Sequence, residues 1–266
     1  MMKYEFLVAG IHMIFLVPEM LDVPDNFQPF LIPTIPYEAT SDSTPEMVLE
    51  VTIQSSDHAA DPFLDQPQKK KDREGPPYYQ MRMTRESFRS FASCGHWLNY
   101  LKFGEMLLPY KRVILHASAI LYDGKAYLFV APSGGGKSTQ AEIWRRCYGS
   151  EILNGDKVIL NLSEEEITVY GSPVAGSSGI YQNRSAPLGA IFVIKKAAFN
   201  RLFPIQGFHR LLVLYNAAVK SVKDDKINEC LLDELREISD KIPLYHYYCT
   251  NGRSAARDLH NELFGD

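Results

Sequence analysis

The stretch that decides the fold is "LHASAILYDGKAYLFVAPSGGGKSTQ", residues 115 to 140. Two apolar runs flank the dipeptide Asp123-Gly124, which is a strong signal for a two-residue β-hairpin turn. The second run leads into a glycine-rich segment and then into "KSTQAEIWRR" (137–146), whose residues favour a helix. The stretch therefore predicts a hairpin, a loop and a helix in direct succession.

The glycine-rich segment follows the phosphate-loop pattern GxxxxGK[ST] except at its first position, where Ala131 replaces glycine. Successive glycines let backbone N–H groups turn toward an anion, and the N-terminus of the following helix adds partial positive charge. Lys137 would reach the β and γ phosphates, and Ser138 would bind Mg²⁺. We predict a nucleotide site made by Ser133, Gly134, Gly135, Gly136, Lys137, Ser138 and Thr139. The competing interpretation is a glycine-rich loop before an ordinary helix.

His116 is placed by the register of the predicted hairpin. A two-residue turn pairs Tyr122 with Lys125, and counting back along both strands then puts His116 opposite Ala131. Strand pairing would thus bring an imidazole ring beside the bound phosphates, where it could take part in catalysis. A histidine that serves only the core is the alternative.

A carboxylate follows the predicted helix. The segment "EILNGDKVIL" (151–160) predicts a strand that ends in Asp156. At the carboxyl end of a strand in an α/β sheet, this side chain would lie near the neighbouring phosphate loop. There it could bind Mg²⁺ or accept a proton from an attacking hydroxyl. Asn154-Gly155-Asp156 also suits a plain turn, which leaves a role without chemistry open.

The two halves of the chain differ in pattern. Residues 1–105 are predicted to form a β-rich subdomain, and residues 106–266 alternate strands with helices, which indicates an α/β core. In the first half we expect two strands around Gly10, strands at 48–54 and 78–83, an exposed loop at 55–77 that includes Lys69, Lys70 and Lys71, and a helix at 90–100. In the second half we expect strands at 188–194 and 243–249 and helices at 209–222, 226–242 and 254–264.

Composition excludes several classes of protein. A net charge of −4 and a pI near 6.0 give no overall field that would attract nucleic acid or an anionic membrane. The apolar opening "YEFLVAGIHMIFLVP" (4–18) is too short for a bilayer span and contains Glu5 and His12, so we expect strands rather than a targeting or membrane segment. The four cysteines form no CxxC pair, which favours reduced thiols and a cytoplasmic protein. Self-association into a homo-oligomer stays open.

Four segments together carry a family resemblance: "LHASAILYDGKAYLFVAPSGGGKST", "EILNGDKVIL", "VYGSPVAG" and "APLGAIFVI", in this order. They resemble the HPr kinase/phosphorylase family and its phosphoenolpyruvate carboxykinase-like relatives. They are most similar to the HPr kinase-like proteins found with peptide-modification genes, such as those for lasso peptides. The resemblance covers residues 110–200 well and the flanks weakly.

The resemblance implies a P-loop core like the C-terminal domain of the HPr kinases, in which a β-hairpin leads into the loop. By position, His116 matches the family's active-site histidine and Lys137 its phosphate lysine. Ser138 matches its metal ligand, and Asp156 matches the aspartate that takes the proton from a seryl hydroxyl. The sequence departs from the family where two adjacent aspartates become Gly155 and Asp156, and where a metal-binding glutamate becomes Thr168.

The departures affect what the resemblance implies about function. Mg²⁺ would rest on Ser138, Asp156 and the nucleotide, and regulation of HPr is not implied because the segment that binds that phosphocarrier is not evident. We expect an ATP- and Mg²⁺-dependent kinase that phosphorylates a hydroxyl, with serine as the expected acceptor group on a peptide, protein or small molecule. A ribosomally made peptide and free serine are rival acceptors, and a donor other than ATP stays open.

Two other functions are considered. The first is an ATP-binding module without phosphoryl transfer that supports peptide modification, which the missing second aspartate favours. The second is a carboxykinase, for which the chain shows no cluster of metal-binding His, Lys and Asp residues. Ser172, Asn183 and Arg184 are secondary candidates at the mouth of the site, and the remaining histidines are expected to be structural or exposed.

Overall fold

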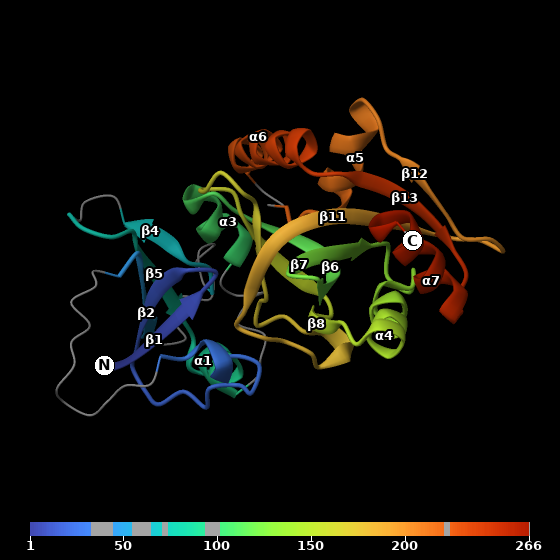
Figure 1. Ribbon diagram of the computed structural model, residues 1–266. Helices are drawn as coiled ribbons and strands as arrows, with labels where there is room; N and C mark the ends of the chain where they lie inside the picture. The colour runs from blue at the N-terminus through green and yellow to red at the C-terminus, as the bar shows by residue number, and fades with distance from the viewer. Residues whose placement is uncertain (33–44, 55–64, 71–73, 94–101, 221–223, 266) are drawn as a thin grey trace. The chain divides into compact units, whose positions relative to one another are not determined.

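The computed structural model describes residues 1–32, 45–54, 65–70, 74–93, 102–220 and 224–265 (Figure 1). The chain divides into two compact units, Met1–Met106 and Leu107–Asp266. Each unit is built around its own β-sheet, and helices accompany both sheets, so the protein is a mixed α/β protein. Among the described residues, no helix combines the length and the apolar character that a bilayer crossing needs.

The N-terminal unit holds a five-stranded sheet with the order β1-β2-β3-β5-β4. Its elements are β1 (Met2–Val8), β2 (Ile11–Val17), β3 (Met47–Ile53), β4 (Gln68–Lys70), β5 (Tyr78–Met83) and α1 (Arg85–Ser93). β1 and β2 form a hairpin whose turn residues, Ala9 and Gly10, both have positive φ, so the predicted turn at Gly10 is confirmed. The strands predicted at 48–54 and 78–83 are confirmed as β3 and β5.

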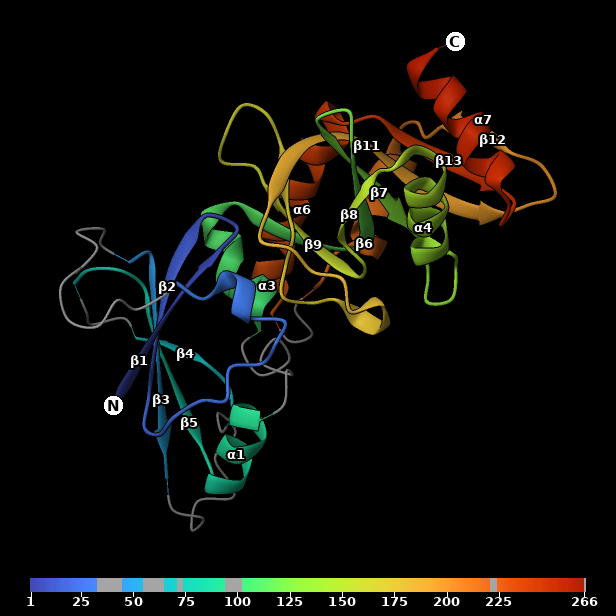
Figure 2. The ribbon, with the colours of Figure 1, turned by 60° about the horizontal axis from the view of Figure 1, so that its bottom comes forward.

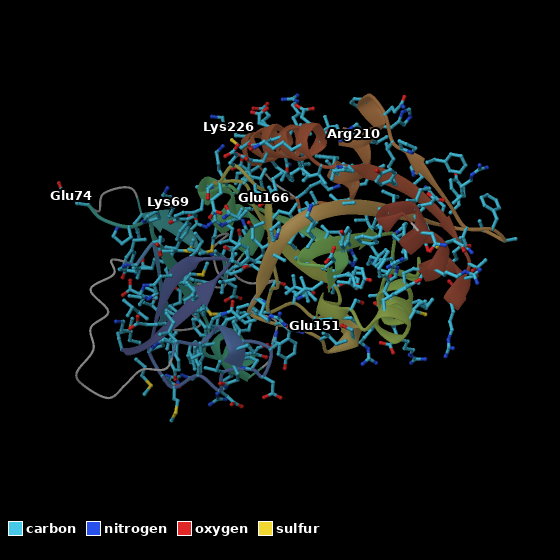
Figure 3. All side chains as sticks on the ribbon, viewed as in Figure 1. Lys69, Glu74, Glu151, Glu166, Arg210 and Lys226 are labelled. Carbon is cyan, nitrogen blue, oxygen red and sulfur yellow. The ribbon has the colours of Figure 1, made fainter. Side chains whose placement is uncertain are left out.

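One prediction for the N-terminal unit needs correction, and a second falls mostly outside the described residues. The loop expected at 55–77 contains β4, in which Lys69 pairs with Tyr79 (Lys69 is labelled in Figure 3), and its residues 55–64 and 71–73 lie outside the described residues. An open sheet edge offers unpaired main-chain groups, which even an exposed lysine segment can use. Of the helix expected at 90–100, residues 90–93 belong to α1, and residues 94–101 lie outside the described residues. α1 begins earlier because the Thr84 hydroxyl accepts a hydrogen bond from the Ser87 amide at 3.0 Å, which caps its first turn.

The C-terminal unit is built on an eight-stranded sheet with the order β10-β9-β6-β7-β11-β13-β12, in which β8 pairs with β6. Its strands are β6 (Arg112–Tyr122), β7 (Lys125–Val130), β8 (Glu151–Asn154), β9 (Lys157–Asn161), β10 (Thr168–Tyr170), β11 (Ser185–Lys196), β12 (Arg201–Pro204) and β13 (Leu244–Cys249). Its helices are α4 (Lys137–Tyr148), α5 (Phe208–Ala217), α6 (Asp225–Lys241) and α7 (Arg253–Phe264), and α3 (Phe103–Leu107) lies at the division between the units.

Helices cover both faces of this sheet. Figures 1 and 2 show α5 and α6 on one side and α4 with α7 on the other. The alternation of side chains along β7 explains the two layers, because Ala126, Leu128 and Val130 pack in the core with α5 and α6. Tyr127 and Phe129 pack on the opposite face with α4 and α7. From Ala126 to Val130, the side chains of β7 therefore alternate between the two faces of the sheet.

The predicted hairpin forms with its predicted turn, since Tyr122 pairs with Lys125 and both Asp123 and Gly124 have positive φ. The ladder between β6 and β7 ends at Ala117 and Val130, one pair before the predicted pairing of His116 with Ala131. β7 leaves the sheet there to enter the glycine loop. His116 pairs instead with Lys157 of β9, on the other side of β6.

The segment 151–160 forms two collinear strands rather than one strand that ends in Asp156. β8 ends at Asn154, Gly155 and Asp156 interrupt the strand, and β9 begins at Lys157 and continues in the same direction. The side chain of Asn154 accepts hydrogen bonds from the amides of Asp156 at 2.8 Å and Lys157 at 3.0 Å, which is an Asx turn. Both strands pair with β6 on the same edge, one after the other.

The remaining predictions hold with shifted ends. β11, α6, β13 and α7 are confirmed near their predicted positions. The helix expected at 209–222 is α5, which ends at Ala217 because Ala218 adopts an extended backbone. Arg210 of α5 donates to the carbonyls of Ser239 and Ile242 at the end of α6, and so ties the two helices together (Arg210 is labelled in Figure 3).

Candidate functional site

A cavity of about 280 Å³ lies at the edge of the large sheet where β7 passes into α4. Figure 1 shows the short connection between these two elements. The described residues that line the cavity belong to the C-terminal unit. They are His116, Ser133, Gly134, Gly135, Gly136, Lys137, Ser138, Thr139, Gly155, Asp156, Lys196 and Asn251. The structure therefore brings together every residue in which the sequence predicted catalysis, nucleotide binding or metal binding.

The glycine loop needs its glycines for two different reasons. Gly134 and Gly136 have φ of +70° and +102°, a backbone conformation that strains other residues. Gly135 has no room for a side chain, because a Cβ there would lie 2.5 Å from the Cβ of Ala131. Ala131, which departs from the phosphate-loop pattern, thus packs against a glycine that leaves space for it.

The N-terminus of α4 opens into the cavity. Gly136 is the N-cap of α4, and within the described chain no side chain caps the helix there. The first amides of an uncapped helix point away from the helix and favour an anion. Ser138 and Thr139 lie in this first turn and line the cavity, so their hydroxyls add donors and acceptors to the backbone amides.

Lys137 is buried beneath the loop, and its Nζ donates to the carbonyl oxygen of Ala131 at 3.0 Å. Burial lowers the pKa of Lys137, and the nearby carboxylate of Asp156 opposes that change. A buried ammonium group with one carbonyl partner retains donors for an anion. Lys137 is therefore placed where an incoming phosphate would relieve the cost of its burial.

His116 and Asp156 form a pair at one end of the cavity, with His116 Nε2 and Asp156 Oδ1 2.8 Å apart. β6 explains why they meet. Its residue Ala119 pairs with Asn154 of β8, and His116 pairs with Lys157 of β9, so the break between β8 and β9 that carries Asp156 lies beside His116. The alternation of β6 points His116 to the same face of the sheet as Ile120, which packs in the core with α4.

Buried polar groups fix the break between β8 and β9 that carries Asp156. Asn154 donates from Nδ2 to the carbonyl of Ser172 at 2.8 Å, and the Ser172 hydroxyl donates to the carbonyl of Lys157 at 2.7 Å. Gly176 passes so close that a Cβ there would lie 2.8 Å from the Cβ of Asp156. Asp156 is thus a turn residue and a cavity residue at once, and the two interpretations of its sequence context are compatible.

The cavity has one acidic side chain. Among its described lining residues only Asp156 carries a carboxylate. A Cβ at the adjacent Gly155 would lie 1.8 Å from the Oγ and 2.6 Å from the Cβ of Ser178, so the Ser178 side chain occupies the space that a second acid would need. Position 155 therefore has no room for a side chain beside Asp156 in this fold.

Oxygen donors for a metal ion are few. In the part of the chain that the structure describes, no group of three or more His, Cys, Asp or Glu side chains is placed to hold a metal. The cavity offers the hydroxyl of Ser138 and the carboxylate of Asp156. This donor set fits Mg²⁺ bound mainly by nucleotide oxygens and water, since Mg²⁺ commonly takes only one or two protein carboxylates.

The sequence analysis missed two lining residues, Lys196 and Asn251. Lys196 ends β11, and its Nζ donates to the carbonyl oxygen of Gly134 at 3.0 Å. Asn251 follows β13. β11 runs parallel to both β7 and β13, so all three strands end at the same edge of the sheet. A polar residue after each predicted strand was the signal that could have found them.

Other candidates from the sequence lie elsewhere in the C-terminal unit. Ser172 is buried, and its hydrogen bond to the Lys157 carbonyl helps to hold the strand break at Asp156. Arg184 forms an ion pair with Glu151 at the start of β8 (Glu151 is labelled in Figure 3). Thr168 pairs with Asn161 and Pro187 in β10. The described lining of the cavity includes none of these three residues, nor Asn183.

The remaining histidines are divided between core contacts and surface. His12 is buried and hydrogen-bonded through Nε2 to Glu5 at 2.7 Å. His260 stacks on Tyr148, and burial lowers the pKa of His246. His58 and His96 lie outside the described residues.

Comparisons with known proteins add little to this geometry. No family model and no curated protein matches the chain. One similar solved chain, described as "Structure of the Hpr(Ser) kinase/phosphatase from Coxiella burnetii", is 13% identical, with a TM-score of 0.32. The similarity covers 57% of this chain and 99% of that chain. At this score the similarity carries no argument about activity, so function is argued from the residues of the cavity.

Proposed function

We propose that the protein is an ATP- and Mg²⁺-dependent kinase that transfers the γ-phosphoryl group to a hydroxyl, with a serine hydroxyl of a peptide, protein or small molecule as acceptor. One observation carries the proposal: a single cavity contains a glycine loop, the open N-terminus of α4, a buried lysine and a His116–Asp156 pair. These are the groups needed to hold a phosphate chain and to align a hydroxyl against its terminal phosphorus.

The loop and Lys137 would hold the donor. The backbone amides at the start of α4 and the ammonium group of Lys137 neutralise negative charge on the β and γ phosphates. Ser138 and Asp156 would hold Mg²⁺, which supplies further charge neutralisation between the phosphates when it is bound. Since these groups are fixed before the substrate arrives, little reorganisation is needed during the reaction.

Asp156 would act on the acceptor. The acceptor oxygen forms a bond to the γ-phosphorus while the bond from that phosphorus to the β–γ bridging oxygen breaks, and ADP leaves with the electron pair. The proton of the acceptor hydroxyl passes to the carboxylate of Asp156. His116, 2.8 Å from Asp156, orients the carboxylate and can donate to a phosphoryl oxygen. The resemblance to the HPr kinase family supports serine as the acceptor.

A second candidate is an ATP-binding module without transfer. The observation that favours it is the tight packing of Gly155 against Ser178, which leaves one carboxylate to serve both Mg²⁺ and the acceptor. In such a module the bound nucleotide would regulate the binding of a partner, and Asp156 would matter only for the backbone conformation between β8 and β9. Lys137→Ala would then abolish partner binding, whereas Asp156→Asn would not.

Transfer of label from γ-³²P-ATP with Mg²⁺ tests the proposal, using serine-containing peptides, protein acceptors and free serine as candidates. Wild type should label an acceptor, and Asp156→Asn should not although it still binds ADP. Glu151→Gln is the matched control, because Glu151 is an acidic residue of β8, the strand just before Asp156, and lies outside the cavity. Labelling by Asp156→Asn at the wild-type rate would contradict the role of Asp156. Nucleotide binding by wild type without transfer to any acceptor would favour the module.

A further inference from the structure

Lys196 occupies a position that the proposed reaction does not yet use. It is the last residue of β11, and its ammonium group donates to the carbonyl oxygen of Gly134, inside the glycine loop, at 3.0 Å. β11 pairs in parallel with β7, with Val193 opposite Val130, so both strands run out at the edge where the loop begins. Lys196 therefore enters the cavity from a strand that is distant in sequence from the loop it contacts.

The side of the loop on which Lys196 lies follows from the strand order. β9, β6, β7, β11 and β13 are neighbours in this order, and the glycine loop follows β7 in the middle. His116 belongs to β6 and Asp156 to the break between β8 and β9, on one side. Lys196 ends β11 and Asn251 follows β13, on the other side. The terminal phosphate would lie at the first side, so the rest of the nucleotide extends toward the second.

The charge of the cavity also points to Lys196. Among the described lining residues, the full charges are those of Lys137, Lys196 and Asp156, beside the titratable ring of His116. Asp156 offsets one of the two lysines, and a polyphosphate chain carries several negative charges. An ammonium group has three donors, so the bond from Lys196 to Gly134 leaves donors for phosphate oxygens.

From these observations we infer that Lys196 is a second nucleotide-binding cation, which contacts the non-transferred phosphates of ADP or ATP from the β11 side of the loop. The inference rests on the proposed function in one respect, that the loop binds a nucleotide. Lys196 also holds the Gly134 carbonyl, and its two roles must be separated by experiment.

Lys195 provides a matched control. Side chains alternate along β11, and Ile194 packs on the face of α4 and α7 whereas Val193 packs on the face of α5 and α6. Lys196 therefore shares its face with α4, and Lys195 points to the other face, where its charge acts on His246. The two lysines are adjacent and both are exposed, but only Lys196 lines the cavity.

Calorimetric titration of the full chain with ADP tests the inference, because ADP lacks the phosphate that would face Asp156. Lys196→Gln keeps an N–H donor for the Gly134 carbonyl but removes the charge, and it should raise the Kd for ADP about tenfold, the effect of one charge-assisted hydrogen bond. Lys196→Arg should restore most of the affinity, and Lys195→Gln should match wild type. The Kd of Lys196→Gln should also depend less steeply on salt than that of wild type, which a purely structural role would not change.

Each outcome decides a separate point. Wild-type affinity in Lys196→Gln, with binding lost in Lys137→Ala, would overturn the inference and leave the proposed function intact. Equal losses in Lys196→Gln and Lys195→Gln would also overturn it, since the effect would be one of general surface charge. Failure of wild type to bind ADP would overturn both the inference and the proposed function. Binding of ADP that depends on Lys196, in a protein that transfers no phosphate, would support the inference and overturn the kinase.

Discussion

The two ends of the cavity differ in how they are built. At one end, His116 of β6 lies 2.8 Å from Asp156, in a break between β8 and β9 that a buried asparagine and a buried serine hold in place. At the other end are two exposed residues, Lys196 at the end of β11 and Asn251 after β13. The first end is made rigid by buried hydrogen bonds and contains the only acid among the described lining residues, whereas the second is exposed and cationic. From this difference we expect that mutations at the Asp156 end change the rate of phosphoryl transfer, whereas mutations at the Lys196 end change the affinity for nucleotide.

The largest expected effect lies at the rigid end. Asp156→Asn keeps the size of the side chain and the backbone conformation between β8 and β9, but the amide cannot accept a proton. We expect the rate of phosphoryl transfer to fall by about 10²–10⁴, the usual contribution of a general base. The Kd for ADP should change little, and rapid-quench kinetics beside calorimetry would measure both. A loss of ADP affinity as large as the loss of rate would mean that the two ends are not separable.

The next largest effect belongs to Lys137, which lies beneath the loop between the two ends. Lys137→Ala removes the buried ammonium group and its bond to Ala131. We expect the Kd for both ADP and ATP to rise about a hundredfold, at the upper range for a hydrogen bond to a charged group. Fluorescence competition with a labelled nucleotide would measure this rise. Circular dichroism of the variant serves as the control for folding, and an unchanged Kd in a folded variant would contradict the phosphate site.

A third prediction concerns the space around the rigid end. Gly155→Asp adds a second acid beside Asp156, but its Cβ would meet the Ser178 hydroxyl at 1.8 Å. We expect the free energy of unfolding to fall by about 1–3 kcal/mol, as for other overpacked sites. Ser178→Gly in the same chain should recover part of this loss, and chemical denaturation of the four variants of this cycle would measure the coupling. Full stability of Gly155→Asp alone would show that the cavity has room for two acids.

The smallest expected effect is a proton linkage at Lys137. Burial lowers the pKa of Lys137 from its usual 10.5, and a bound polyphosphate would favour the charged ammonium and raise it again. At an alkaline pH between the pKa of Lys137 in the free protein and its pKa in the complex, the complex holds a proton that the free protein lacks. Through Lys137, binding of ADP should therefore take up a fraction of a proton there and none near neutral pH. Calorimetry in two buffers of different ionisation enthalpy would measure the uptake, and Lys137→Ala should show none.

The same lowered pKa makes a prediction about stability. An unfolded chain binds more protons than the folded one between the lowered pKa of Lys137 and 10.5. The contribution of Lys137 to the free energy of unfolding therefore rises as pH increases through that window. Below the window the buried ammonium has a constant cost. Subtracting the pH profile of Lys137→Ala from that of wild type isolates this contribution, and the opposite slope would contradict the burial.

Much of the fold around the loop could be predicted because its signals are local. Asp123-Gly124 fixes the turn, and the turn fixes the register of β6 against β7 as far as Ala117 and Val130. The glycines fix the loop, and the alternation in β7 fixes which helices cover which face. These features depend on neighbours in sequence, and such neighbours are what a single sequence displays.

The parts that could not be predicted depend on partners far apart in sequence. The turn at Asn154 was recognised only as an alternative, because nothing local shows that β8 and β9 share one edge of β6. His116 was expected beside Ala131 and instead pairs with Lys157, although its side chain still reaches the cavity. Lys196 was missed because the pairing of β11 with β7 joins strands separated by α4 and three further strands.

The most direct test of the account is a crystal structure of the full chain with a non-hydrolysable ATP analogue and Mg²⁺. We expect the phosphate chain to lie in the glycine loop, with the terminal phosphorus about 6 Å or less from the carboxylate of Asp156, which leaves room for one acceptor hydroxyl. The α and β phosphates should lie within reach of Lys196. A terminal phosphate that points toward Lys196 and away from Asp156, or an analogue bound outside the loop, would contradict the account.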